Sequence, residues 1–149
     1  MRCVVQKVTQ ASVTVDGEIV GKIGNGYMVL VGAEDGDGEA DVNYCAEKIS
    51  GLRVFEDENE KLNLSLADVG GSVLMVSQFT LLGDARHGRR PSFIRAARPE
   101  TAEPLFNALC ENIAARGIHV ETGRFRTHME VALVNDGPCT ILLDSKKTF

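Results

Sequence analysis

The sequence predicts a single α+β domain, spanning residues 1–149, in which a mainly antiparallel, barrel-like β-sheet packs against two helices. Two observations predict this fold class. The first half of the chain consists largely of short strand-like runs joined by tight turns, and the first two runs, residues 2–9 and 11–16, are rich in valine and threonine. Two longer segments instead repeat apolar residues at helical spacing. A chain of 149 residues with 44% hydrophobic content is large enough for one domain with its own core.

Eight segments are expected to form strands. Residues 27–31 are apolar throughout, which indicates a strand covered on both faces, whereas residues 62–66 alternate leucine with polar residues, as in a half-buried strand. A turn at Asp16-Gly17 joins the second strand to the third. The expected strands cover residues 2–9, 11–16, 19–23, 27–31, 62–66, 72–80, 126–134 and 139–144.

Two helices are expected, at about residues 38–51 and 100–116. Each carries apolar residues three and four positions apart, which form one buried stripe, and each is followed or ended by a glycine, Gly51 or Gly117. The stripe of the first helix is Val42, Cys45, Ala46 and Ile49, and that of the second is Ala102, Leu105, Phe106, Leu109 and Ile113.

Composition argues against several classes of protein. No apolar run approaches the ~20 residues that span a membrane, and the polar Gln6 and Lys7 interrupt the first apolar stretch, unlike a signal peptide. We therefore expect a cytoplasmic protein with no membrane partner. The four cysteines form no Cys-x-x-Cys pair and the three histidines are scattered, so the sequence predicts neither a metal site nor a cofactor.

Positive charge is concentrated in one loop. The net charge of −5 argues against broad coating of nucleic acid. Residues 85–98, however, contain five arginines and no acid. Because the guanidinium fork suits phosphate oxygens, this arginine loop is either a phosphate-contacting patch or a solvated loop that pairs with acids elsewhere in the chain. Charge alone does not separate these interpretations.

Two short motifs are unusual for their positions. Ser77-Gln78-Phe79-Thr80-Leu81 places polar side chains where an apolar strand ends. Asn135-Asp136-Gly137-Pro138-Cys139-Thr140 places Gly-Pro between two strand-like runs, where a plain hairpin would use Asn-Gly or Asp-Gly without proline. Proline removes an N–H and glycine permits unusual backbone geometry, which suits a site built from main chain. The ordinary alternatives are a strand end capped by hydroxyl hydrogen bonds and a turn proline.

Together the two motifs resemble those of the D-aminoacyl-tRNA deacylase family. The resemblance extends over nearly the whole chain, since three further stretches occur in the family's order and spacing: residues 4–8, 88–93 and 122–125. It implies an enzyme of translation quality control that binds tRNA and hydrolyses the ester bond of D-aminoacyl-tRNA. It also implies that glycyl-tRNA is hydrolysed and that L-aminoacyl groups are rejected, which is chiral proofreading.

The first motif allows three kinds of chemistry on such an ester. Thr80 as a nucleophile needs a base, and no histidine or lysine lies nearby in the sequence. The side chains of Ser77, Gln78 and Thr80 can bind substrate. The backbone N–H groups of Phe79 and Thr80 can instead hold the oxyanion while water attacks, and we favour this arrangement. The resemblance implies that the substrate's ribose 2′-hydroxyl helps to activate that water.

The resemblance also assigns roles to other residues. It implies a cis Gly137-Pro138 bond that rejects L-amino acids in the partner subunit's active site, and hence a homodimer with shared sites. It implies an adenosine pocket at Phe125 and Met129, although both read equally as core residues. It favours RNA-backbone contacts for the arginine loop, with Arg86, Arg89 and Arg90 as candidates. Three apolar residues could add interface area or be buried within one subunit: Val131, Leu133 and Ile141.

Two departures and two alternatives accompany this interpretation. Lys7 stands where arginine is usual in the family, so anchoring of the Gly-Pro segment is expected to be looser. Cys139 replaces a larger apolar residue and is expected to be a small buried hydrophobe. One alternative is a relative that removes L-amino acids, which the intact first motif argues against. The other is a non-catalytic nucleic-acid-binding or assembly module, which the arginine loop supports.

Overall fold

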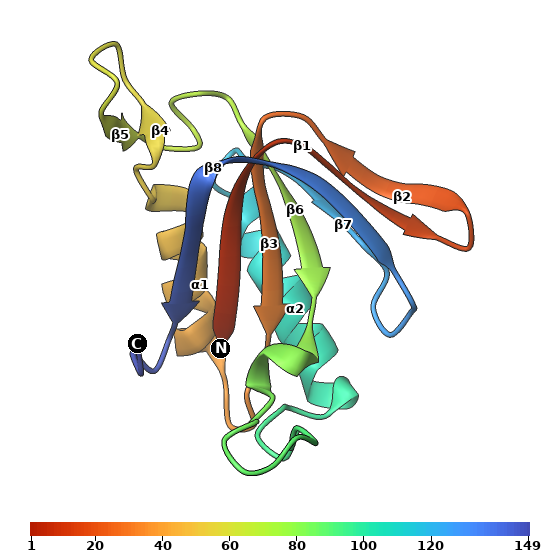
Figure 1. Cartoon of the computed structure of the whole chain (residues 1–149). Helices are drawn as coiled ribbons and strands as arrows, with labels where there is room; N and C mark the ends of the chain where they lie inside the picture. Colours follow the sequence, from red (N-terminus) through yellow and green to blue (C-terminus); the bar gives the residue numbers. More distant parts are fainter.

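The computed structural model describes all 149 residues and contains one curved six-stranded sheet (Figure 1). Its central strand, β1, pairs with β3 and β2 along one edge and with β8 along the other. The strand order is β2-β1-β3-β6-β7, with β8 on the remaining edge of β1. The strands are β1 (Arg2–Val15), β2 (Glu18–Ile23), β3 (Gly26–Gly32), β6 (Ser72–Ser77), β7 (His119–Thr122) and β8 (Glu130–Asp144).

The direction of the strands follows from their connections. β1 is antiparallel to β2, β3 and β8, as expected from the short turns of the first half of the chain. β6 is parallel to both β3 and β7, which the sequence did not indicate. Parallel neighbours need long crossovers. Here helix α1 (Glu39–Gly51) with the small hairpin of β4 (Phe55–Glu56) and β5 (Leu62–Leu64) supplies one, and helix α2 (Pro99–Ala114) supplies the other.

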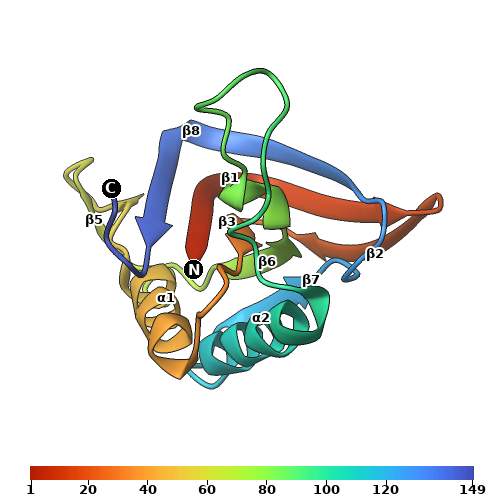
Figure 2. The same ribbon diagram turned by 90° about the horizontal axis from the view of Figure 1, so that it is seen from below.

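The sheet separates two apolar cores. Helices α1 and α2 lie side by side on one face of the sheet (Figure 2). The larger core lies between the sheet and these helices and includes Tyr27, Val29, Val73 and Met75. Alternate residues of the same strands, such as Met28 and Leu74, point into a smaller core enclosed by the curl of the sheet. The predicted α+β class with two packed helices is therefore confirmed.

The helices match the expected apolar stripes closely. All four residues of the first stripe are buried, and Gly38 precedes the helix, with its N–H donating to the Asp41 carboxylate at 2.9 Å. In α2, Phe106, Leu109 and Ile113 are buried, and Pro99 occupies its first turn. Because no helix is both long and apolar enough, none of them could cross a membrane.

Several strand predictions were wrong in their boundaries. Residues 2–9 and 11–16 belong to one strand, β1, whose pairing with β8 shifts register around Val8. Residues 126–129 precede β8, and β8 then continues through the Gly-Pro motif, because segments on both sides of the motif pair with β1. The strand expected to reach residue 80 ends at Ser77, and a 3-10 turn, η1 (Phe79–Leu82), follows.

Candidate active site

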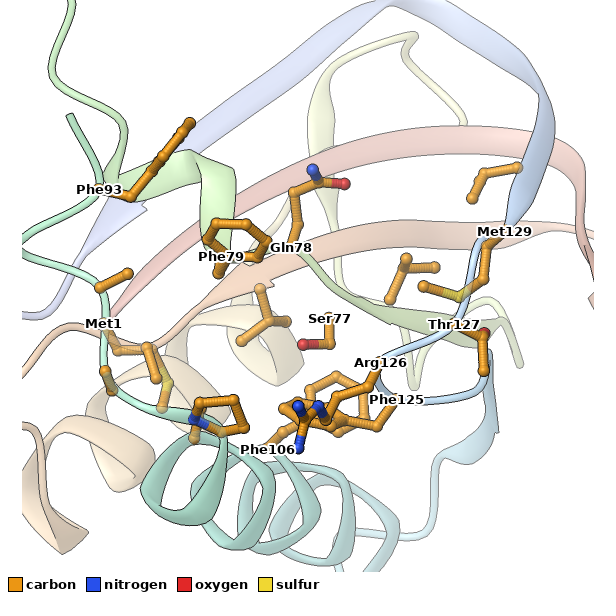
Figure 3. Close-up of a pocket in the computed structure, with 18 of the residues that line it drawn as sticks. Met1, Ser77, Gln78, Phe79, Phe93, Phe106, Phe125, Arg126, Thr127 and Met129 are labelled. Atoms are coloured by element: carbon orange, nitrogen blue, oxygen red, sulfur yellow. The ribbon is translucent and has the colours of Figure 1, made fainter. Parts of the chain in front are cut away.

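A cavity of about 710 Å³ lies beyond the end of β6 (Figure 3). Three segments that are distant in the sequence form much of its wall: the end of β6, the stretch from the end of the arginine loop into the first turns of α2, and the turn that precedes β8. Its lining is mainly hydrophobic and contains no aspartate or glutamate. A concave apolar pocket with a few polar groups is the usual form of a small-ligand site.

Ser77, Gln78 and Phe79 of the first motif all line this cavity. Ser77 is the last residue of β6 and pairs with Val31, and the Gln78 N–H donates to the Val31 carbonyl at 2.7 Å. The chain then turns sharply into η1, which packs closely on Gly32. A Cβ on Gly32 would lie 2.9 Å from the Gln78 carbonyl oxygen and 2.7 Å from Leu82 Cδ2. Glycine at position 32 therefore lets the motif bend back onto the sheet.

Thr80 is exposed and, unlike Ser77, Gln78 and Phe79, does not line the cavity. Its hydroxyl instead accepts a hydrogen bond from the Gln78 side-chain amide. The backbone bonds of the turn run from Leu81 N–H to the Gln78 carbonyl and from Gly83 N–H to the Thr80 carbonyl, so they do not use the N–H groups of Phe79 and Thr80. The bond between Gln78 and Thr80 is the local side-chain hydrogen bond expected of a capped strand end. The N–H groups of Phe79 and Thr80 are nevertheless free of the turn's own backbone bonds.

Phe125 and Met129 lie on the wall opposite the first motif, in the turn between β7 and β8. The Phe125 ring packs against Phe106 of α2, with ring centroids 6.3 Å apart. The sequence predicted Met129 within a strand and Phe125 just before it, whereas both occupy an irregular segment that faces the cavity. The two segments that carry the candidate catalytic and adenosine-binding residues therefore meet in one cavity.

Several lining residues were missed by sequence reasoning. Arg126, Thr127 and His128 lie between the two candidate adenosine-pocket residues, and Phe93 packs edge-on against Phe79 with ring centroids 5.3 Å apart. Arg126, Thr127 and His128 fall in a segment predicted to be a strand and form no recognisable motif, so the sequence carries no functional signal for them. Only the expectation that residues 125 and 129 face a ligand could have directed attention to the residues between them.

The arginine loop is only partly free to bind an anion. Its Arg95 donates two hydrogen bonds to Glu34, at 2.7 and 3.1 Å, and so fixes the loop to the end of β3. Arg86 forms a two-pronged pair with Asp84, which raises the pKa of the guanidinium and lowers that of the carboxyl. Arg89 and Arg90 are exposed and have no acidic partner. Arg86 and Arg95 thus pair with acids of the chain, whereas Arg89 and Arg90 stay candidates for contact with an anion.

The Gly137-Pro138 segment lies away from the cavity of this chain. Its peptide bond is cis, both residues are exposed, and neither lines the cavity. Residues 136–139 of β8 lie opposite Lys7 of β1, whereas Ser77 of β6 lies four residues further along the strands and three strands across from β8. These offsets amount to roughly 13 Å along the strands and about 14 Å across them. In Figure 1 the middle of β8 and η1 accordingly lie at opposite ends of the sheet.

Asn135 holds the Gly-Pro segment in place from within its own subunit. Its side-chain amide donates to the carbonyls of Lys7, at 2.9 Å, and Cys139, at 3.2 Å, and thereby bridges β1 and the far side of the motif. Its oxygen packs against Gly137, where a Cβ would lie only 2.4 Å away. A glycine at position 137 is therefore required by the folding of the loop itself.

The two departures from the family pattern are both visible at this segment. Lys7 is nearly buried, its ammonium lies 5.2 Å from the centre of the Phe55 ring, and it reaches Asp136 at only 3.8 Å. One long ion pair is a weaker anchor than a two-pronged arginine contact. Cys139 is half-buried and packs against the larger core, so it is less buried than expected.

Other reactive groups lie outside the cavity. Cys3 and Cys110 are poor nucleophiles, because contact with Cys45 and burial raise the pKa of Cys3 and burial raises the pKa of Cys110 to about 12. No cluster of three or more histidine, cysteine or acidic side chains could hold a metal ion. The chemistry of the cavity thus depends on its backbone and neutral side chains, together with Arg126 and His128.

The fold and the site define a class: an α+β protein with an apolar cavity at the end of a central strand and a Gly-Pro segment on an exposed edge. Comparison with known proteins then identifies the family. Residues 4–144 match the family model described as D-Tyr-tRNA(Tyr) deacylase. The chain belongs to this family, whose members are hydrolases acting on ester bonds.

Individual relatives match the whole chain. A D-aminoacyl-tRNA deacylase of Symbiobacterium thermophilum is 64% identical over 100% of this chain and 99% of its own length. One from Desulfitobacterium hafniense is 60% identical over the full length of both. A solved structure titled c-Myc DNA Unwinding Element Binding Protein has a TM-score of 0.91 and 41% identity and covers 97% of this chain and 98% of its own.

A more distant solved structure, titled as a probable eukaryotic D-amino acid tRNA deacylase, has a TM-score of 0.79. It covers 95% of this chain and 97% of its own, at 17% identity. At this level of identity the similarity supports the fold only.

Proposed function

We propose that this protein hydrolyses the ester bond between a D-aminoacyl group and the terminal ribose of tRNA, releasing the D-amino acid and free tRNA. The observation that carries the proposal is that Ser77, Gln78 and Phe79 face Phe125 and Met129 across one cavity, in a chain that belongs to a deacylase family. Such a cavity can hold the aminoacyl ester at one wall and the terminal adenosine at the other. tRNA is charged in the cytoplasm, so we assign the protein to that compartment.

The ester is already an activated bond, so positioning and oxyanion stabilisation can supply most of the catalysis. Water adds to the ester carbonyl carbon, and the backbone N–H groups of Phe79 and Thr80 hold the resulting oxyanion. The carbon–oxygen bond to ribose then breaks, and the ribose oxygen leaves as a hydroxyl. The neighbouring ribose 2′-hydroxyl assists the attacking water, as the family resemblance implies.

The second part of the proposal is a homodimer in which Gly137 and Pro138 complete the partner's cavity. Their exposure and their distance from their own cavity support this arrangement. Val131, Leu133 and Ile141 are partly buried and pack against the cores, which favours burial within one subunit over a place in the interface. Two other apolar residues of β8 point outward, Val134 with 48% and Leu142 with 57% of the side chain exposed. A two-fold contact through this face makes the exchange reciprocal.

The proposed filter explains the expected substrate range. Main-chain carbonyls of Gly137 and Pro138 would hold the α-amino group and leave no space for an L side chain. A D side chain would point outward, so that its identity would matter little. Glycine has no side chain to exclude, so glycyl-tRNA is expected to be hydrolysed as well.

A non-catalytic nucleic-acid-binding module remains the second candidate. The DNA-binding title of the 41% identical structure and the unpaired Arg89 and Arg90 favour it. Incubation of the purified protein with D-tyrosyl-tRNA carrying a labelled amino acid separates the two. Release of label well above the buffer rate supports the deacylase, whereas retention of label on protein-bound tRNA supports the binding module.

Thr80→Ala is expected to keep most of the activity, with a loss of less than ~10-fold in the single-turnover rate. The reason is that the Thr80 hydroxyl lies outside the cavity and bonds to Gln78, while the proposed role belongs to the backbone. The control is Ser77→Ala, which changes a hydroxyl that does line the cavity. A loss beyond ~10³-fold for Thr80→Ala, with substrate binding intact, would instead assign the catalysis to its side chain.

A further inference from the structure

Arg126 is the only arginine that lines the cavity, and Figure 3 shows its side chain directed into the cavity beside Phe125 and Phe106. It occupies the turn before β8 with a φ of 62°, in the left-handed region that glycine adopts more readily than arginine. The backbone of the turn is thus held in a conformation that the arginine itself does not favour, and the exposed Arg126 lines the cavity there.

The Arg126 guanidinium has no partner within the protein. It forms no ion pair and no side-chain hydrogen bond, and the cavity contains no carboxylate that could pair with it. Two arginines of the arginine loop differ, since Arg86 is paired with Asp84 and Arg95 with Glu34. A cation that faces an acid-free cavity is available to an anionic group of a bound ligand.

The charges of the substrate indicate which group this is. The aminoacyl end carries a positive α-ammonium group, which a guanidinium repels, and the adenosine is neutral. The nearest anion is the phosphate attached to the 5′ oxygen of the terminal nucleoside. A guanidinium suits phosphate oxygens because its planar fork donates two parallel hydrogen bonds.

We propose that Arg126 binds the phosphate of the terminal nucleotide and so positions the adenosine between Phe125 and Met129. This inference rests on the proposed deacylase function and adds to it a substrate contact on the cavity wall. Arg126 contacts a group remote from the ester. It should therefore lower chiefly the substrate concentration at half-saturation and have less effect on the rate at saturation.

The test compares two minimal substrates in single-turnover assays: the 3′-O-D-tyrosyl ester of adenosine and the same ester of adenosine 5′-monophosphate. The variants are Arg126→Gln and Arg126→Gly, the second being suited to the left-handed backbone of this position. The matched control is Arg124→Gln, which removes an exposed arginine two residues away that does not line the cavity.

For the wild type, we expect the phosphate-bearing ester to half-saturate at a concentration about tenfold lower than the phosphate-free ester. Both Arg126 variants should abolish this difference by weakening only the phosphate-bearing ester, and Arg124→Gln should preserve it. Equal weakening of both esters would overturn the proposal in favour of a contact to the base or the amino acid. An unchanged difference in the Arg126 variants, or its loss in Arg124→Gln, would also overturn it. Hydrolysis of the D-esters by the wild type tests the deacylase function separately.

Discussion

Gly137→Ala is expected to lower the rate of D-aminoacyl-tRNA hydrolysis by ~10²-fold or more while leaving the subunit folded. An alanine Cβ at this position would lie 2.4 Å from the Asn135 side-chain oxygen and 2.6 Å from the Cys139 amide nitrogen. Neither atom can move without displacing the loop, because Asn135 bonds to the carbonyls of Lys7 and Cys139. A displacement of about 1 Å in a positioning group is enough for a loss of this size.

The loop is exposed, so this loss should occur without a large change in melting temperature. Gly51→Ala is the matched control, since a Cβ at this helix end meets no atom within 4 Å. It should leave hydrolysis unchanged. Full activity of Gly137→Ala, with the loop undisturbed, would show that the Gly-Pro segment takes no part in catalysis.

Subunit mixing then tests whether the segment acts in the partner. Gly137→Ala subunits are combined with subunits inactivated at Ser77 by a bulky residue, Ser77→Leu. If sites are shared, each heterodimer contains one site with an intact first motif and an intact Gly-Pro segment, and activity returns. An active wild-type monomer, or no recovery despite demonstrated subunit exchange, would contradict the shared site.

Asp37→Ala is expected to have the largest effect on stability, about 3 kcal/mol of unfolding free energy, or roughly 10 °C in melting temperature. The Asp37 side chain is fully buried and accepts contacts from the Lys146 ammonium at 2.6 Å, the Met1 ammonium at 2.8 Å and the Glu34 N–H at 2.7 Å. Removing the carboxylate leaves buried donors without a partner. Thermal unfolding measures the effect, and exposed Asp35→Ala is the control, for which less than ~0.5 kcal/mol is expected.

Two further carboxylates close to Asp37, those of Asp41 and Asp144, should make the protein less stable in acid. Burial alone would raise the pKa of Asp41 and Asp144, but hydrogen bonds from Ser145 and Thr148, among others, together with nearby positive charges lower both below the ordinary value. A lowered carboxyl pKa contributes stability above about pH 4, and this contribution is lost as the pH falls through the folded-state pKa. The melting temperature should therefore drop below about pH 4, and less steeply in Asp144→Asn. Equal slopes would contradict this assignment.

The fold was predictable where local patterns agree with tertiary packing. The apolar stripe Val42, Cys45, Ala46 and Ile49 predicted α1 because all four residues face the core. The parallel pairing of β6 was not predictable, because strand direction depends on which edge a distant segment reaches. The continuation of β8 through Gly137-Pro138 was missed for a related reason: β1 supplies hydrogen-bonding partners on both sides of a motif that reads locally as a turn.

The two motifs of the candidate site were predictable from the sequence, whereas most of the other residues that line the cavity were not. Ser77, Gln78 and Phe79 stood out as polar and aromatic residues after a buried strand, and they do line the cavity. Arg126 did not stand out, because its significance depends on a left-handed turn and on an acid-free cavity that only the folded chain reveals. The ion pair of Arg86 with Asp84 likewise required the structure, since the acid lies just outside the segment that the charge pattern had defined.

Stereospecific hydrolysis is tested most directly by single-turnover assays on D-tyrosyl-tRNA and L-tyrosyl-tRNA prepared on the same tRNA. With enzyme in excess, D-tyrosine should be released rapidly, whereas L-tyrosine should be released no faster than in buffer. Because tRNA, ester and side chain are identical, only the configuration at Cα differs between the two substrates. Equal enzymatic rates on both would contradict a site that excludes the L side chain with the Gly137-Pro138 backbone.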